Sequence, residues 1–321
     1  MGADNVIHTL WPDYYTLEQE QKQEQMTQTL SAIASDLTIK ALIINHAIPG
    51  TNAAVDVLRK TRQDMFVVYC TPQVDTFDIS KNVDLILAPD ELGMGYTMPT
   101  QAVILGAKVF VHYSFPRHMA QAVFSGRREI LKSECARLGL EFINANTMDT
   151  ISGVGVAGAQ QAIMEDVPKK IAEYGKDTAF FVTSCGLQPG LIKAVVDGGA
   201  IYPQPCCPSP FHGFPTALGI EGGVLDIDRV IAETRSILKE KGMSGRLSTW
   251  PISVSMTETY TGVEYAIRWI NGDVPKDGLD LETLKACMEE YTGVDVSFTS
   301  YEENGVTFDN FQMFLMDYLT Y

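Results

Sequence analysis

The chain has 321 residues and a mass of 35.4 kDa, which corresponds to about two domains at roughly 150 residues each. Apolar residues make up 45% and charged residues 20%, so the chain can bury its own core, and disorder, collagen and coiled coil are excluded as the main architecture. The sequence holds no run of the ~20 apolar residues that a membrane-spanning helix needs. A net charge of −16 repels phosphate backbones and anionic membranes, which argues against nucleic acid as a partner.

Short apolar runs alternate along the chain with amphipathic stretches of helical length. The expected strands are 6–10, 41–45, 66–70, 84–88, 109–113, 141–144, 179–183, 199–202, 249–254 and 295–300. The expected helices are 17–34, 50–61, 96–105, 117–138, 156–173, 187–196, 226–241, 256–271 and 280–291. Strands that are apolar on both faces suit a sheet covered by helices on both sides. The alternation therefore predicts an α/β protein with parallel sheets and right-handed crossovers.

Two interruptions of this alternation divide the chain. The first is Ser114-Phe115-Pro116, and the second is the glycine- and proline-containing segment 242–251. We therefore expect one lobe formed by 1–114 plus 250–321, a second lobe formed by 115–249, and a ligand cleft between them.

Three other patterns favour structural roles. Gly153–Gly158 spells GxGxxG, but its first glycine comes nine positions after Asn144, where the preceding strand should end, whereas a dinucleotide fingerprint needs its glycines directly after the strand. Asp90-Glu91 is an acidic pair, which arises easily in a chain with 40 acidic residues. The carboxyl-terminal aromatic residues recur at steps of three and four and predict one packed helix face: Phe308, Phe311, Phe314 and Tyr318.

The cysteines and the amino terminus carry little direct information. Six cysteines are present without CxxC or zinc-finger spacing, so we expect scattered buried thiols, no metal and no cofactor. The first residues hold no charged and apolar export signal. Either the protein is cytoplasmic or an export signal has been replaced at this end.

The residues that follow the predicted strands are the strongest functional signal. Ligands of open parallel sheets bind outside the carboxyl ends of the strands. Aromatic, hydroxyl, amide and imidazole groups suit a small polar ligand, whereas catalysis needs a convergent acid, base or nucleophile. The candidate ligand-binding residues are Trp11, Tyr14, Tyr15, His46, Thr71, Glu91, Ser114, Arg117, Asn146, Thr183, Ser184, Gln188, Tyr202 and His212.

Several stretches resemble a known superfold. ALIINHAIPGTNAAVDVLRKTRQDMFVVY and GLIKAVVDGGAIYPQP resemble the second repeat units of the two lobes of type I periplasmic-binding proteins. TLEQEQKQEQMTQTLSAIASD and FPRHMAQAVFSGRREILKSECARLGLEF resemble a bacterial family of uncharacterised function with that fold, often carried as lipoproteins. The resemblance implies two doubly wound parallel-sheet lobes joined by crossovers, with a ligand held by strand ends of both.

The expected function is that of a non-enzymatic solute-binding protein. It would be exported and lipid-anchored, would meet the membrane only through that anchor, and would serve an ABC-type transporter permease or a membrane receptor. One alternative is a cytoplasmic ligand-sensing regulator domain. A second is a nucleotide-dependent oxidoreductase that uses Gly153–Gly158.

Overall fold

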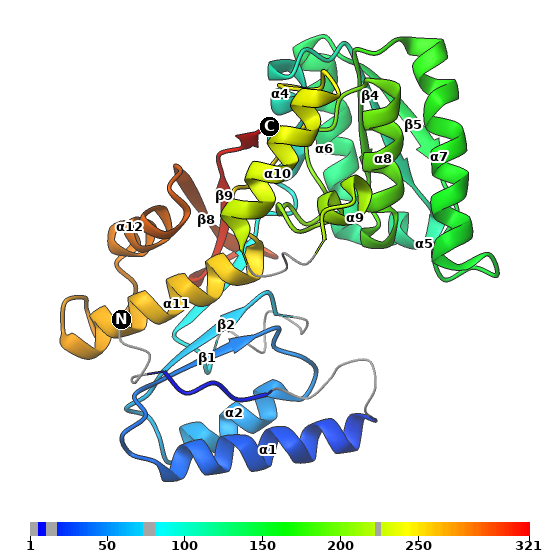
Figure 1. Cartoon of the computed structure of the whole chain (residues 1–321). Helices are drawn as coiled ribbons and strands as arrows, with labels where there is room; N and C mark the ends of the chain where they lie inside the picture. The colour runs from blue at the N-terminus through cyan, green and yellow to red at the C-terminus, as the bar shows by residue number, and fades with distance from the viewer. Residues whose placement is uncertain (1–5, 11–17, 73–80, 222–225) are drawn as a thin grey trace. The chain divides into compact units, whose positions relative to one another are not determined.

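The computed structural model describes residues 6–10, 18–72, 81–221 and 226–321 (Figure 1). The chain forms two compact units. Unit 1 comprises Met1–Ala88, Thr257–Tyr291 and Phe298–Phe314, and unit 2 comprises Pro89–Met256, Thr292–Ser297 and Leu315–Tyr321. The first change of unit falls at 88/89 rather than near the expected 114, whereas the return at 256/257 lies close to the expected 250.

Unit 1 is built on a five-stranded sheet. Its strands are β1 (Ala41–Asn45), β2 (Phe66–Cys70), β3 (Leu85–Pro89), β8 (Val296–Glu303) and β9 (Val306–Met316), in the order β1-β2-β3-β9-β8. β1 pairs with β2, and β2 with β3, in parallel. The parallel part follows from the strand–helix alternation, because a parallel pair needs a long crossover between its strands.

Helices cover both faces of the β1–β2 region, as the apolar runs predict. Leu42 and Val67 share one core with α1 (Gln19–Ser35) and α2 (Thr51–Arg59). The other face meets α11 (Val254–Asn271), which is followed by α12 (Leu281–Thr292) (Figure 1). A Cβ on Gly262 of α11 would lie only 3.1 Å from Cγ1 of Val68, so the glycine allows the helix to approach the sheet closely.

Unit 2 contains a second parallel sheet. β4 (Val109–Ser114) lies between β5 (Glu141–Asn146) and β6 (Thr178–Val182), and both pairings are parallel. The helices of this unit are α4 (Met94–Ile104), α5 (Pro116–Met119), α6 (Ala122–Leu138), α7 (Gly155–Tyr174), α8 (Gln188–Gly198), α9 (Phe214–Leu218) and α10 (Ile227–Glu240), with a 3-10 turn, η2 (Cys185–Leu187), before α8. β7 (Ser248–Thr249) pairs antiparallel with β10 (Leu319–Thr320).

Alternate residues of these strands face different helices. Val111 and Phe180 belong to a core that also contains Ile163 of α7 and Leu191 of α8. On the opposite face, the Phe181 ring lies 5.3 Å from the guanidinium carbon of Arg127 in α6. The two faces of the sheet therefore differ, because one packs in an apolar core and the other holds a buried charge.

Four sequence-based expectations for individual elements are wrong. Residues 6–10 form no strand, 199–202 contributes only isolated bridges at Ile201 and Tyr202, and of the expected strand 249–254 only Thr249 lies in a strand. The carboxyl-terminal aromatics lie on β9 and on the segment after it, not on a helix. The decisive signal is Asn304-Gly305, whose φ angles of 52° and 76° make a two-residue turn between β8 and β9.

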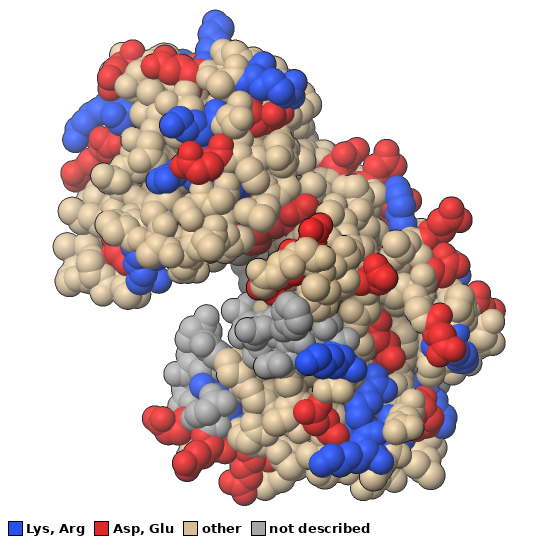
Figure 2. Space-filling view, turned by 180° about the vertical axis from the view of Figure 1, so that it is seen from behind, with Lys and Arg blue, Asp and Glu red and all other residues tan. Residues whose placement is uncertain are grey.

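Acidic and basic side chains are interspersed over the visible surface (Figure 2). Since acids outnumber bases by 40 to 24, the surface carries the acidic excess of the whole chain. Among the described residues, no helix combines the length and apolar character needed to cross a bilayer.

Candidate functional site

Three polar side chains meet at the carboxyl ends of β4 and β6. Two of them, Ser114 and Thr183, are predicted site residues, and the third is His118. The Oγ of Ser114 lies 2.9 Å from Oγ1 of Thr183, and the same Thr183 oxygen lies 2.9 Å from Nδ1 of His118. Tyr113 is the register partner of Val182, so the residues that follow meet at one edge of the sheet. Burial, and then the nearby Arg117, lower the pKa of His118, which keeps the imidazole neutral near pH 7 and able to accept or donate.

Arg117 lies beside this group on α5. Its Nε and Nη2 donate to the two carboxylate oxygens of Asp149, at 2.7 and 2.8 Å, and its guanidinium carbon lies 5.2 Å from the Phe115 ring centre. Hydrogen bonding to Arg117 lowers the pKa of Asp149 to about 2. The ion pair fixes the direction of the guanidinium, while Asn146, the register partner of Ser114, is exposed at the end of β5.

Glu91, another predicted site residue, is partly exposed and held in an ion pair. It forms an ion pair with Arg127, whose side chain is 1% exposed. Burial raises the pKa of Glu91, and the Arg127 charge opposes that shift. Within the described part of the chain, Nε and Nη2 of Arg127 have no hydrogen-bond partner, although its guanidinium lies 5.2 Å from the Phe124 ring centre. Glu91 therefore neutralises a buried cation.

Gln188, Tyr202 and Ser184 form a buried network. The Gln188 amide donates to the carbonyls of Val182 and Ser184 at 2.9 and 3.0 Å, and the Tyr202 hydroxyl donates to its Oε1. Gln188 and Tyr202 are fully buried. In this arrangement their polar atoms join β6 to α8 rather than face solvent.

Two predicted residues lie in unit 1, directly after β1 and β2. His46 and Thr71 both have positive φ, at 54° and 39°, so the backbone turns sharply at both strand ends. Burial lowers the pKa of His46. The Thr71 hydroxyl lies 2.8 Å from both carboxyl oxygens of Glu258, a fully buried residue that sequence reasoning missed. Trp11, Tyr14 and Tyr15 lie outside the described residues.

His212 lies beside three cysteines that no sequence pattern connects to it. Cys185 follows β6, and Cys206 and Cys207 follow the bridge at Tyr202. The Sγ of Cys185 is 3.4 Å from that of Cys206 and 3.7 Å from that of Cys207. The expectation of scattered buried thiols is wrong for these three, because folding joins positions that are 21 residues apart.

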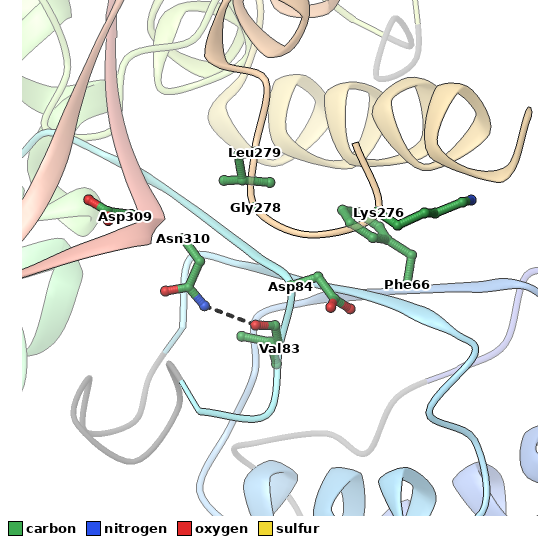
Figure 3. Close-up of a pocket in the computed structure, with 8 residues that line it drawn as sticks. All are labelled: Phe66, Val83, Asp84, Lys276, Gly278, Leu279, Asp309 and Asn310. Atoms are coloured by element: carbon green, nitrogen blue, oxygen red, sulfur yellow. Dashed lines mark hydrogen bonds between the residues drawn. The ribbon is translucent and has the colours of Figure 1, made fainter. Parts of the chain in front are cut away.

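A pocket of about 240 Å³ opens elsewhere, at the amino ends of β2 and β3 in unit 1 (Figure 3). Its lining is Phe66, Val83, Asp84, Lys276, Gly278, Leu279, Asp309 and Asn310, which includes none of the predicted site residues. Two of its polar groups have protein partners: Asn310 donates to the Val83 carbonyl at 2.9 Å, and Asp84 accepts from Arg59. Because the pocket lies away from the carboxyl ends of the parallel strands, we keep the strand ends of unit 2 as the candidate site.

The GxGxxG stretch keeps the offset that the sequence indicates. β5 ends at Asn146 and α7 begins at Gly155, so Gly153 does not directly follow the strand. A pyrophosphate site would need both a tight turn after the strand and the helix start.

A family model described as "Protein of unknown function (DUF3798)" matches residues 2–248. The chain belongs to this family. Two uncharacterized proteins of Treponema pallidum (strain Nichols) are similar to it. One is 31% identical over 170 residues, 53% of this chain and 79% of the relative, and the other is 29% identical over 144 residues, 45% and 63% respectively.

Solved structures share the architecture of this DUF3798 member. A protein of Clostridium difficile 630, provisionally called a transcriptional regulator, matches with a TM-score of 0.87 and 22% identity over 97% of this chain and 86% of that one. A sugar ABC transporter protein of Actinomyces odontolyticus ATCC 17982 matches with a TM-score of 0.52 and 12% identity, over 80% and 71%. The predicted α/β fold of the type I periplasmic-binding-protein kind is confirmed.

Proposed function

We propose that the protein is a non-enzymatic solute-binding protein that holds a small polar ligand at the strand ends. The observation that carries this proposal is the Ser114–Thr183–His118 group at the carboxyl ends of β4 and β6, where the Thr183 hydroxyl lies 2.9 Å from both the Ser114 hydroxyl and the His118 imidazole. Such groups donate and accept without net charge, which suits the hydroxyls of a neutral solute. A structure of the same fold is described as a sugar ABC transporter, which supports this ligand class.

The arrangement of Arg117 refines the ligand class. Its Nε and Nη2 are engaged by Asp149, so the pair presents both charges together rather than a free cationic fork. A paired cation and anion favour a hydroxyl or zwitterionic ligand over a simple anion. We also predict that unit 1 contributes ligand contacts through His46 and Thr71.

Export, lipid anchoring and delivery of the ligand to a transporter permease or membrane receptor belong to the same proposal. The alternative is a cytoplasmic ligand-sensing regulator, which is favoured by the described role of the Clostridium difficile structure. Fractionation of cells that express the native gene, with metabolic labelling by a radioactive fatty acid, separates the two. Labelled protein in the membrane fraction supports export and anchoring, and unlabelled cytoplasmic protein supports the regulator.

Ligand binding is tested by calorimetric titration with neutral sugars and polyols, amino acids and nucleosides, after native mass spectrometry of freshly purified protein. Thr183→Val removes the hydroxyl shared by Ser114 and His118 and should weaken binding about tenfold or more, equivalent to about 1.4 kcal/mol. Thr234→Val is the matched control, because Thr234 is equally buried and its hydroxyl has no hydrogen-bond partner in the described part of the chain. Equal affinities in the two variants would contradict the site.

A further inference from the structure

The cluster formed by Cys185, Cys206, Cys207 and His212, the thiol–imidazole cluster, shares no residue with the Ser114–Thr183–His118 group proposed for the solute. We propose that the thiol–imidazole cluster is a binding site for one thiophilic metal ion, with Zn²⁺ in tetrahedral coordination by three thiolates and one imidazole as its preferred occupant. This inference does not depend on the solute-binding role.

The spacing of the sulfur atoms is the first argument. The three Sγ–Sγ distances are 3.4, 3.7 and 4.0 Å, all too long for a disulfide. Zinc–sulfur bonds of about 2.3 Å in a tetrahedron place neighbouring sulfurs about 3.8 Å apart. The distances between the three sulfur atoms are therefore already close to those between the sulfur ligands of a tetrahedral zinc site. The ligand atoms of Cys185, Cys206 and His212 also lie within 4.8 Å of one another.

The orientation of His212 is the second argument. Its Nδ1 lies 2.8 Å from the backbone carbonyl of Cys207. A carbonyl oxygen can only accept, so Nδ1 carries a proton, which leaves Nε2 as the ring nitrogen that a metal would take. Metal-binding histidines are commonly held in this way by a second hydrogen bond to a carbonyl or carboxylate.

Local structure and access complete the argument. Cys185 begins the 3-10 turn after β6, and Cys206 and Cys207 come shortly after Ile201, which bridges to Ala179 of β6, so the three cysteines follow neighbouring segments of one sheet. Cys185 and Cys207 are exposed, which leaves an entry path, while Cys206 is buried.

The experiment loads the reduced, metal-free full chain with Zn²⁺ or Co²⁺ under anaerobic conditions, without any sugar. We expect one metal ion per chain and, for Co²⁺, a thiolate-to-metal charge-transfer band with the visible bands of tetrahedral cobalt. Cys185→Ala and Cys206→Ala should lose the bound metal and the band. Cys207→Ala and His212→Gln should weaken Zn²⁺ binding by at least about tenfold in competition with a chromogenic chelator.

Cys135→Ala is the matched control, since Cys135 is a buried free thiol of the same unit outside the cluster, and it should retain the full metal content. Absence of the charge-transfer band would overturn the proposal, as would an affinity unchanged by His212→Gln. A mass two units lower with two thiols missing after denaturation would also overturn it, by showing a disulfide instead. Because no solute is present, these outcomes are independent of the sugar titration.

Discussion

The hydroxyl of Thr71 lies 2.8 Å from each carboxyl oxygen of Glu258, and Glu258 is fully buried in unit 1. Burial raises the pKa of Glu258 well above its ordinary value, while the contacts with Thr71 oppose the shift. A protonated carboxyl satisfies both contacts, because its O–H can donate to Thr71 Oγ1 while the Thr71 hydroxyl donates to the other oxygen. A side chain after strand β2 is thus tied to α11, far away in the sequence.

This pair predicts a dependence of stability on pH. Because the folded pKa of Glu258 lies above the unfolded one, folding takes up a proton, and the free energy of unfolding falls as pH rises from the unfolded pKa toward the folded pKa. Glu258→Gln removes this dependence, which for one proton is at most about 1.4 kcal/mol per pH unit. Urea unfolding of the wild type and of Glu258→Gln between pH 5 and 8 measures how steeply the free energy of unfolding of each protein changes with pH. Glu282→Gln, at an exposed position, is the control, and parallel curves for wild type and Glu258→Gln would contradict the assignment.

The Glu91–Arg127 pair predicts a large loss of stability when its anion is removed. Glu91→Gln leaves the guanidinium of Arg127, which is 1% exposed, without its counter-charge, and should cost about 3–5 kcal/mol in the free energy of unfolding. Glu129→Gln breaks the neighbouring surface pair with Arg128 and should cost less than about 1 kcal/mol. Chemical denaturation of both variants gives the comparison, and equal costs would show that burial does not decide the effect.

Gln188 and Tyr202 provide a test that separates a structural role from a ligand-binding role. Gln188→Leu removes the two hydrogen bonds of the amide and the acceptor of the Tyr202 hydroxyl, and should cost about 1–3 kcal/mol, whereas Tyr202→Phe breaks one bond and should cost about 1 kcal/mol. Thermal unfolding without ligand measures both losses. If the variants are as stable as wild type but lose solute affinity, the two side chains belong to the ligand site instead.

The turn between β8 and β9 predicts that replacing Gly305 destabilises the fold through backbone conformation alone. Gly305 has a φ of 76°, and the space that a Cβ would enter holds no other atom within 4 Å. Gly305→Ala therefore adds no clash but forces alanine into the left-handed region, at a cost of about 1–2 kcal/mol. Gly153→Ala is the control, because Gly153 has open space and no positive φ. Chemical denaturation of both variants measures their free energies of unfolding. A Gly305→Ala variant as stable as the wild type would refute the turn geometry.

Local pattern is sufficient where burial on both faces leaves an unbroken apolar run. FVVYC at 66–70 and VFVHY at 109–113 predict strands and form β2 and most of β4, because such runs have one stable environment, a sheet covered by helices. The residues after those strands are therefore predictable as polar positions at one sheet edge, and Ser114 and Thr183 do meet there.

Local pattern fails where two periodicities compete or where partners are distant. The aromatic steps at Phe308, Phe311 and Phe314 fit a helix, but the Asn304-Gly305 turn pairs the segment with β8. The sequence by itself determined the α/β class and most strand ends, since these depend on neighbouring residues. Only the tertiary structure decided that Cys185 lies beside Cys206 and His212, because crossovers bring together side chains that no local spacing connects.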